Sequence, residues 1–140
     1  MPTIARYLRC ALPALLAFAL VGSAAPARAE RVVLQVSDGN VQTWNQAFNV
    51  AGNLRQAYGP DTQIEVVAFG QGINMLKLDA PVSSRLAEAR KSGVVIYACE
   101  NSMERNKLTR NDMAPDLIYA EAGVKHIITR QREGWALIRP

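Results

Sequence analysis

The stretch "RVVLQVSDGN", from Arg31 to Asn40, joins a nearly continuous β-branched run to a cluster of turn-forming and helix-capping residues. A continuous apolar run of this length is typical of a strand that is covered on both faces of its sheet. Asp38, Gly39 and Asn40 then favour a turn and the N-cap of a helix. A buried strand that leads directly into a helix predicts a protein of the α/β class.

The same alternation continues to the end of the chain. Further strands are predicted at "QIEVVAF" (63–69), "VVIYA" (94–98), a weak "LIYA" (117–120) and an edge strand "WALIRP" (135–140). Between them, apolar periodicity, capping residues and glycine stops predict helices at 41–58, from Asp79 and Pro81 to Gly93, and at 124–131. Residues 99–106 are expected to begin a short helix or a turn, and a capping box formed by Thr109 and Asp112 predicts a further helical turn. Strands separated by helices pair in parallel through right-handed crossovers, so we expect a three-layer α/β/α sandwich.

The first 29 residues have the organisation of a secretory signal peptide. Two arginines precede an apolar run from Cys10 to Gly22, and the sequence "ARA" at 27–29 follows. The run is too short for a membrane span, and no later stretch approaches the roughly 20 apolar residues that a span needs. We therefore expect cleavage before Glu30, a periplasmic location, and a single domain over residues 30–140 without a membrane span.

Removal of the signal changes the charge and the cysteine content. The full chain has 16 basic and 12 acidic residues, but three of the basic ones lie in the signal, which leaves 13 against 12 and a net charge of +1. This balance gives no support for a nucleic-acid partner. Cys10 leaves with the signal, so Cys99 is the only remaining thiol and no intramolecular disulfide can form.

The loops that follow the first three strands are the expected location of a site. In open parallel sheets, ligands bind outside the carboxyl ends of the strands, where such loops converge. These loops provide Cys99 as the candidate reactive residue. They also provide six candidate substrate-binding residues: Asp38, Gly70, Gly72, Asn74, Asn101 and Ser102.

Two interpretations of Cys99 are open at this stage. It lies at the end of a strand and before a predicted helix, whose N-terminus would favour a thiolate over a thiol. Glu100 acts in the opposite direction, because a neighbouring carboxylate disfavours a second negative charge. Cysteine is also among the residue types that are most often buried, so Cys99 could simply fill space under a helix.

The glycine-rich segment "GQGINM" (70–75) superficially resembles a nucleotide-binding loop. Met75 stands where a third glycine is needed, the segment follows the second strand instead of the first, and no acidic residue lies about 20 positions later. We expect an ordinary loop that needs glycine for its backbone conformation, or a bend whose amides approach an anionic sulfur species. Motifs of conventional hydrolases, dithiol oxidoreductases and haem attachment are absent from the sequence.

The remaining chemistry-bearing side chains favour structural roles. His126 is the only histidine, and we expect it to be solvated or to cap the last helix. Met75 and Met103 could bind a soft cation together with a thiolate, but scattered methionines more often fill gaps in a core. Trp44 and Trp135 are interpreted as core or interface anchors. No metal or cofactor is predicted.

Four separated segments resemble the DsrE/DsrF-like superfamily, specifically its small exported single-domain members. They are "VSDGNVQTWNQAFNVAGNL", "IEVVAFGQGINML", "VIYACENSM" and "AGVKHIITRQREGWALIRP". Together they extend over nearly all of residues 30–140 in the order and spacing of the family.

The resemblance implies a five-stranded, mainly parallel sheet and assembly into homo-oligomers. It also implies that Cys99 receives sulfane sulfur as a persulfide and passes it to the thiol of an acceptor protein. Asn101 and Ser102 match the polar pair that follows the family's cysteine, and backbone amides near them are expected to stabilise the sulfur anion. The competing hypothesis is a non-catalytic, homo-oligomeric binding module in which Cys99 is packed and unreactive.

Overall fold

The computed structural model describes residues 29–140 and contains one five-stranded sheet with the order β4-β3-β2-β1-β5. Apart from Ala29, the predicted export signal lies outside the described residues. The strands are β1 (Arg31–Val36), β2 (Gln63–Ala68), β3 (Val95–Cys99), β4 (Ile118–Ala120) and β5 (Ala136–Ile138). All four pairings are parallel, and β5 is an edge strand as predicted.

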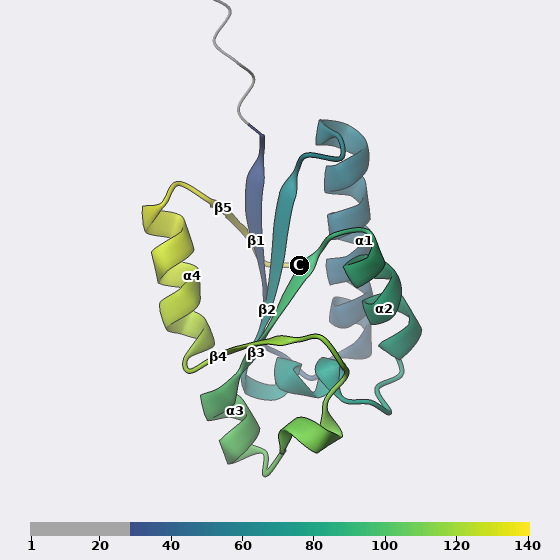
Figure 1. The fold of residues 1–140 in the computed structure, drawn as a ribbon, viewed down its shortest axis with the longest axis vertical. Coiled ribbons are helices and arrows are strands. Elements are labelled where there is room, and N and C mark those ends of the chain that lie inside the picture. The colour runs from purple at the N-terminus through teal and green to yellow at the C-terminus, as the bar shows by residue number, and fades with distance from the viewer. Residues whose placement is uncertain (1–28) are drawn as a thin grey trace, which may run out of the picture.

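The helices form two unequal layers around this sheet (Figure 1). Helices α1 (Val41–Tyr58) and α2 (Ser83–Lys91) cover one face, whereas α4 (Gly123–Arg132) lies alone on the other. The short helix α3 (Glu100–Arg105) and the 3-10 helix η1 (Gly70–Leu76) lie at the carboxyl ends of the strands. The predicted three-layer sandwich is therefore confirmed, with one face less completely covered than the other.

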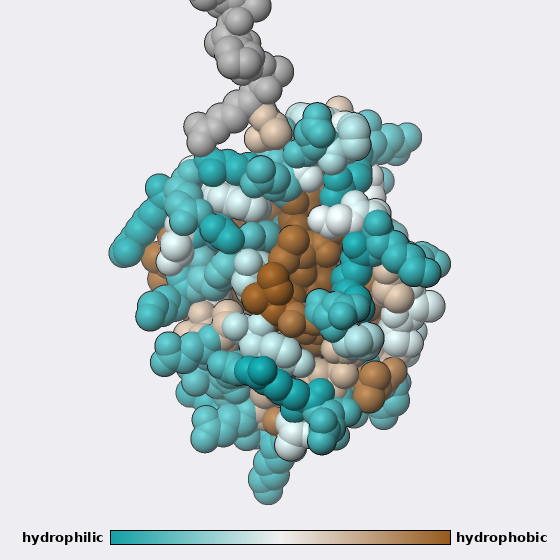
Figure 2. Space-filling view, viewed as in Figure 1, coloured by the Kyte–Doolittle hydropathy of each residue, from teal (hydrophilic) through white to brown (hydrophobic). Residues whose placement is uncertain are grey.

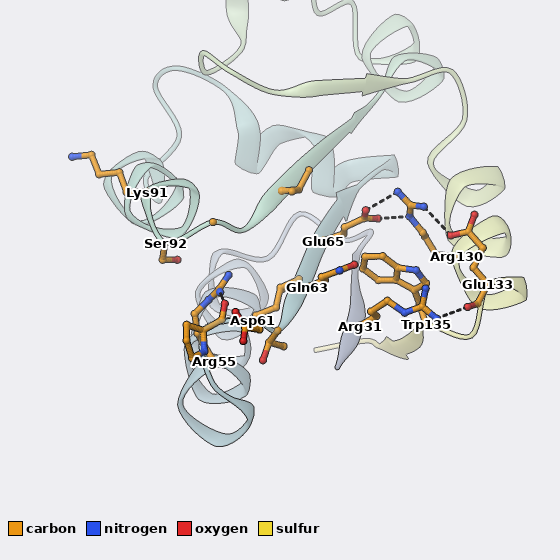
Figure 3. A pocket seen from close by; sticks show the side chains of 15 residues that line it. Arg31, Arg55, Asp61, Gln63, Glu65, Lys91, Ser92, Arg130, Glu133 and Trp135 are labelled. Carbon is orange, nitrogen blue, oxygen red and sulfur yellow. Dashed lines mark hydrogen bonds and ion pairs between the residues drawn. The ribbon is translucent and has the colours of Figure 1, made fainter. Parts of the chain in front are cut away.

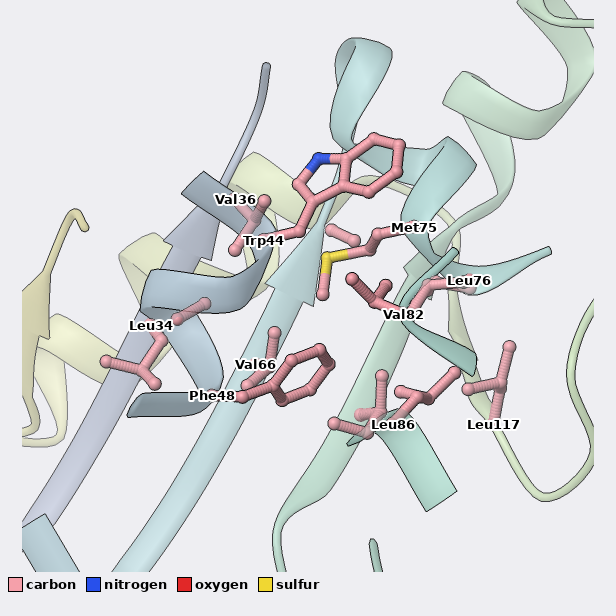
Figure 4. Packing of buried hydrophobic residues seen from close by; sticks show 14 of the residues in the cluster. Leu34, Val36, Trp44, Phe48, Val66, Met75, Leu76, Val82, Leu86 and Leu117 are labelled. Carbon is pink, nitrogen blue, oxygen red and sulfur yellow. The ribbon is translucent and has the colours of Figure 1, made fainter. Parts of the chain in front are cut away.

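The larger part of the core lies between the sheet and the layer formed by α1, α2 and η1 (Figure 4). Trp44 and Met75 are buried in it, and Met103 packs in the same cluster. A smaller cluster on the α4 side contains Ile127 and Trp135. The predictions that the tryptophans anchor the core and that these methionines fill it are confirmed.

Local capping explains where several elements begin. Asn40 caps α1, because its side-chain oxygen accepts a hydrogen bond from the backbone amide of Gln42 at 2.8 Å. The predicted capping box of Thr109 and Asp112 is also present, at a short 3-10 helix η2 (Arg110–Asp112). Hydrogen bonds from the backbone amide and then the hydroxyl of Thr109 lower the pKa of Asp112.

Two local predictions are wrong. The segment 70–76 forms the 3-10 helix η1 instead of a loop, and it lies so close to β1 that a Cβ on Gly72 would be 2.3 Å from the carbonyl oxygen of Val36. Helix α2 begins at Ser83 and not at Asp79 or Pro81. Backbone turns occupy residues 77–83 first, and the Asp79 carboxylate pairs with Lys77 at 3.2 Å.

Candidate functional site around Cys99

Cys99 is the last residue of β3 and the N-cap residue of α3. Its thiol lies under the beginning of a different helix, because the backbone amide of Gly123, the first residue of α4, donates to Sγ at 3.3 Å. On the other side, Sγ lies 4.0 Å from the carbonyl oxygen of Glu121. The residue is only 4% exposed, so the sulfur is held between backbone groups at the bottom of the site.

Helix α4 can approach Cys99 this closely because its first residue is glycine. A Cβ on Gly123 would lie 3.1 Å from a methyl carbon of Val67 and 3.3 Å from the Cβ atoms of Cys99 and Phe69. Such distances are tighter than ordinary van der Waals contact. The sequence indicated only that a helix begins near Val124, and nothing in its pattern connects Gly123 with Cys99.

A cavity of about 520 Å³ lies above the sulfur. Four of the predicted site residues line it: Gly70, Cys99, Asn101 and Ser102. The remaining lining is mixed, with Arg105 and Asn106 as polar side chains and Phe69 and Val124 as apolar ones. The volume is in the range of small-molecule sites.

Hydrogen bonds fix the loops around this cavity. The backbone amide of Gly70 donates to the Ser102 hydroxyl oxygen at 2.8 Å, which ties η1 to α3. The backbone amide of Asn101 donates to the carbonyl oxygen of Glu121 at 3.1 Å. The Asn101 amide is therefore not directed at the Cys99 sulfur, and the amide that reaches the sulfur is that of Gly123.

Three predicted site residues do not line the cavity. Asp38 belongs to the entry of α1, where its side chain accepts from the Asn40 amide and its carbonyl accepts from the Trp44 indole N–H. Gly72 allows the close contact between η1 and β1. Asn74 donates to the carbonyl oxygen of Gln71 within η1. All three stabilise the loops next to the site, and none of them lies with Cys99.

The charges near the cavity favour an anion. Glu100, expected to oppose a thiolate, pairs with Arg110 at 2.7 Å and does not line the cavity. The Arg110 guanidinium also lies over the Tyr119 ring, 4.2 Å from its centroid. Arg105 lines the cavity, and among residues 29–140 no carboxylate lies within 4 Å of its guanidinium. The site therefore has one uncompensated positive charge.

A second cavity, of about 760 Å³, lies at the amino ends of the strands (Figure 3). On its wall, the Glu65 side chain is only 6% exposed, and its carboxylate pairs with Arg130 at 2.8 Å. The same carboxylate lies 2.7 Å from Nε2 of His126, whose side chain is only 16% exposed. The prediction that His126 is solvated or caps a helix is therefore wrong, because it pairs with a buried carboxylate.

This buried charge cluster is a structural feature. The hydrogen bonds that Arg130 donates to the Glu65 carboxylate raise the pKa of Arg130, so the guanidinium stays charged at any physiological pH. Arg130 reaches both carboxylate oxygens of Glu65, and His126 shares one of them. Sequence reasoning missed the cluster because Glu65 is embedded in the apolar run "QIEVVAF", which predicts only a strand.

Neither a metal site nor a membrane helix emerges from residues 29–140. In this part of the chain, histidine, cysteine and carboxylate side chains do not gather in groups of three or more that could hold a metal ion. Within the same residues, no helix is both long and apolar enough to cross a bilayer.

The comparison with family models gives one match, to the DsrE/DsrF-like family over residues 30–140. The match therefore begins where the predicted export signal ends. A search of curated proteins found no match.

Solved structures with the same fold come from several organisms. A protein of unknown function from Methanobacterium thermoautotrophicum is 32% identical, with a TM-score of 0.76 over 79% of this chain and 99% of its own. A conserved protein of unknown function from Bacteroides thetaiotaomicron is 16% identical, with a TM-score of 0.64 over 79% of this chain and 95% of its own. The ychN protein of E. coli is 10% identical, with a TM-score of 0.60 over 79% and 99%. The last two show likeness of fold alone.

Proposed function

The chain belongs to the DsrE/DsrF-like family, and from this premise we propose that it is a sulfur carrier that holds sulfane sulfur as a persulfide on Cys99. The observation that carries the proposal is the contact between the Cys99 sulfur and the first backbone amide of α4 at the bottom of a cavity. The DsrE/DsrF-like family is associated with sulfur relay, and this association suggests sulfane sulfur as the substrate.

Loading is a transfer of sulfur without net oxidation. The Cys99 thiolate attacks the outer sulfur of thiosulfate, or a terminal sulfur of a polysulfide. A new S–S bond forms at Cys99 while the S–S bond of the donor breaks. The leaving group, sulfite or a shortened polysulfide, departs with the electron pair. In unloading, an acceptor thiolate attacks the outer sulfur of the Cys99 persulfide, and the Cys99 thiolate leaves.

The surroundings of the sulfur favour both the Cys99 thiolate and the Cys99 persulfide anion. A backbone N–H at the N-terminus of the ten-residue helix α4 stabilises negative charge through its hydrogen bond and through the helix dipole. Arg105 adds a positive charge at the cavity wall, which attracts an anionic donor. The cavity provides room for the second sulfur atom above Cys99.

The location and partners belong to the same proposal. Residues 1–29 act as the export signal, so the carrier works in the periplasm and exchanges sulfur with a thiol-bearing acceptor protein. We also propose that the protein forms homo-oligomers. Helix α4 leaves Val124 51% and Ile128 44% exposed, which is apolar area available to a second copy.

The low exposure of Cys99 favours a second candidate function. A thiol that is 4% exposed and held by backbone groups would also suit a non-catalytic binding module, with the cavity as its ligand site. The two functions can be distinguished by whether a thiol reagent reaches the Cys99 sulfur in the folded protein.

Titration of the native protein with a thiol reagent separates these functions. With protein that lacks residues 1–29, and therefore Cys10, we expect Cys99 to react in the folded state and Cys99→Ser to show no reaction. Reaction only after denaturation would support the binding module and contradict the carrier. Circular dichroism of both proteins provides the control for folding.

A further inference from the structure

Strand β3 has an open edge over the first part of its length. Strand β2 pairs with residues 95–98 of β3, but β4 pairs only with residues 97–99. Val95 and Ile96 therefore have a neighbouring strand on the β2 side and none on the β4 side.

Strand β4 stops short because of the residues that precede it. Asp116 has a φ of 57°, a left-handed conformation that turns the chain away before it can run beside Val95. Pro115 has no backbone N–H for a ladder. Arg90 of helix α2 holds the Asp116 carboxylate in an ion pair. The open edge is thus a fixed feature of the fold.

An apolar groove of about 470 Å³ follows this edge. Its walls include Val94, Val95, Ile96 and Ile118, and two of these side chains are unusually accessible, Val95 at 37% and Ile118 at 47%. Figure 2 shows a cleft of hydrophobic residues in the middle of this face, bordered by hydrophilic ones. Contiguous exposed apolar surface of this kind marks an interaction site.

The groove also presents backbone groups. In a parallel sheet, successive residues direct their N–H and C=O groups to opposite sides, so either Val95 or Ile96 directs both groups toward the open side. Outside the sheet ladders, neither residue makes a backbone hydrogen bond to any part of the described chain. An extended polypeptide is the ligand that pairs with such an edge while it fills an apolar groove.

The charge at one end of the groove further defines the ligand. Lys91 lines the groove next to the amino end of β3, and within residues 29–140 no carboxylate lies within 4 Å of its ammonium group. In Figure 3 its side chain points away from the other labelled residues. The nearby Asp116 is already paired with Arg90. A segment with a carboxylate beside Lys91 would complement this charge.

We propose that the open edge of β3 binds an extended segment of a partner protein by strand addition. Aliphatic side chains of the segment contact Val95 and Ile118, and an acidic residue at one end pairs with Lys91. The surface involves none of the residues that hold the Cys99 sulfur, so the inference does not depend on the sulfur chemistry.

The test uses a fluorescein-labelled probe peptide, Thr-Val-Thr-Val-Thr-Glu, and fluorescence anisotropy with the full protein. We expect saturable binding, weakened about tenfold or more in Ile118→Lys, because a charge then faces the apolar segment. The matched control is Leu78→Lys, which alters a 56% exposed leucine outside the groove and should leave binding unchanged. A probe ending in lysine instead of glutamate should bind about fivefold more weakly.

Three results would overturn the proposal. The first is no binding of the unmodified probe at millimolar concentration. The second is equal binding of a probe N-methylated on alternate backbone nitrogens, because that ligand cannot form the ladder. The third is conversion of an oligomer into monomers by Ile118→Lys in analytical ultracentrifugation, which would identify a second copy as the occupant.

Discussion

The first backbone amide of helix α4, that of Gly123, donates a hydrogen bond to Sγ of Cys99 at 3.3 Å. The two residues are 24 positions apart and come from different elements, and each is the residue type that the contact requires. Glycine admits the helix to within this distance, and cysteine provides an acceptor that becomes stronger when it ionises. The contact therefore gives the Cys99 sulfur a hydrogen-bond donor at the N-terminus of α4.

Replacement of Gly123 by proline should slow the reaction of Cys99 with iodoacetamide at neutral pH. Proline is tolerated at the first position of a helix but has no N–H to donate. A hydrogen bond to a charged group contributes about 1.5–3 kcal/mol, so a loss of about tenfold or more in rate is expected. Gly123→Ala introduces similar crowding, keeps the amide, and serves as the control. Equal rates for the two variants would contradict the role of the amide.

Replacement of Arg105 by glutamine should selectively slow the reaction of Cys99 with anionic reagents. At a separation of about 4 Å in water, the attraction between unit charges is about 1 kcal/mol, which is roughly a fivefold change in rate. The measurement is the ratio of the rates with iodoacetate and with iodoacetamide. Arg105→Lys should restore the ratio, and Arg132→Gln, at the far end of α4, should leave it unchanged. A ratio unaffected by Arg105→Gln would exclude charge recognition by this residue.

Replacement of Glu65 by glutamine should strongly destabilise the fold. The buried carboxylate holds both Arg130 and His126, and removal of one partner from a buried ionic cluster costs about 3–5 kcal/mol. Urea denaturation measures the loss. Asp116→Asn alters an ion pair with a 79% exposed carboxylate and should cost less than about 1 kcal/mol. Similar losses in the two variants would show that the Glu65 cluster contributes no special stability.

The main elements of the fold could be predicted because their signals are local. Helix α1 has a capping residue at Asn40, an apolar stripe and a terminal Gly59 within one continuous segment. The buried strands are recognisable from their β-branched runs. The position of Cys99 at the end of β3, before a short helix, followed from the same signals.

The environment of Cys99 could not be predicted because it depends on distant residues. Neither Gly123 nor Arg105 carries a sequence pattern that assigns it to the cavity. The buried ion pairs of Glu65 could not be predicted either, because its partners follow it by more than 60 positions. Asp38, Gly72 and Asn74 follow strand ends, as ligand-binding residues do, but backbone turns need the same residue types at the same positions.

Alanine substitutions test whether Gly72 is needed for the close contact between η1 and β1, with Gly52 as the control. Gly72→Ala should lower the free energy of unfolding by about 1–3 kcal/mol, because the new Cβ would lie 2.3 Å from the carbonyl oxygen of Val36. Gly52→Ala, in α1 with no atom within 4 Å of the new Cβ, should instead raise it by about 0.5–1 kcal/mol. Thermal unfolding of both variants measures the difference. A neutral Gly72→Ala would contradict the steric role.

Whether Cys99 carries sulfur can be measured by intact-mass spectrometry of the protein without residues 1–29. After incubation with polysulfide and removal of the excess, we expect the protein to gain the mass of one sulfur atom. A low-molecular-weight thiol should reverse this gain, and Cys99→Ser should not show it. An unchanged mass of the wild-type protein, or the same gain in Cys99→Ser, would show that Cys99 is not a sulfur carrier.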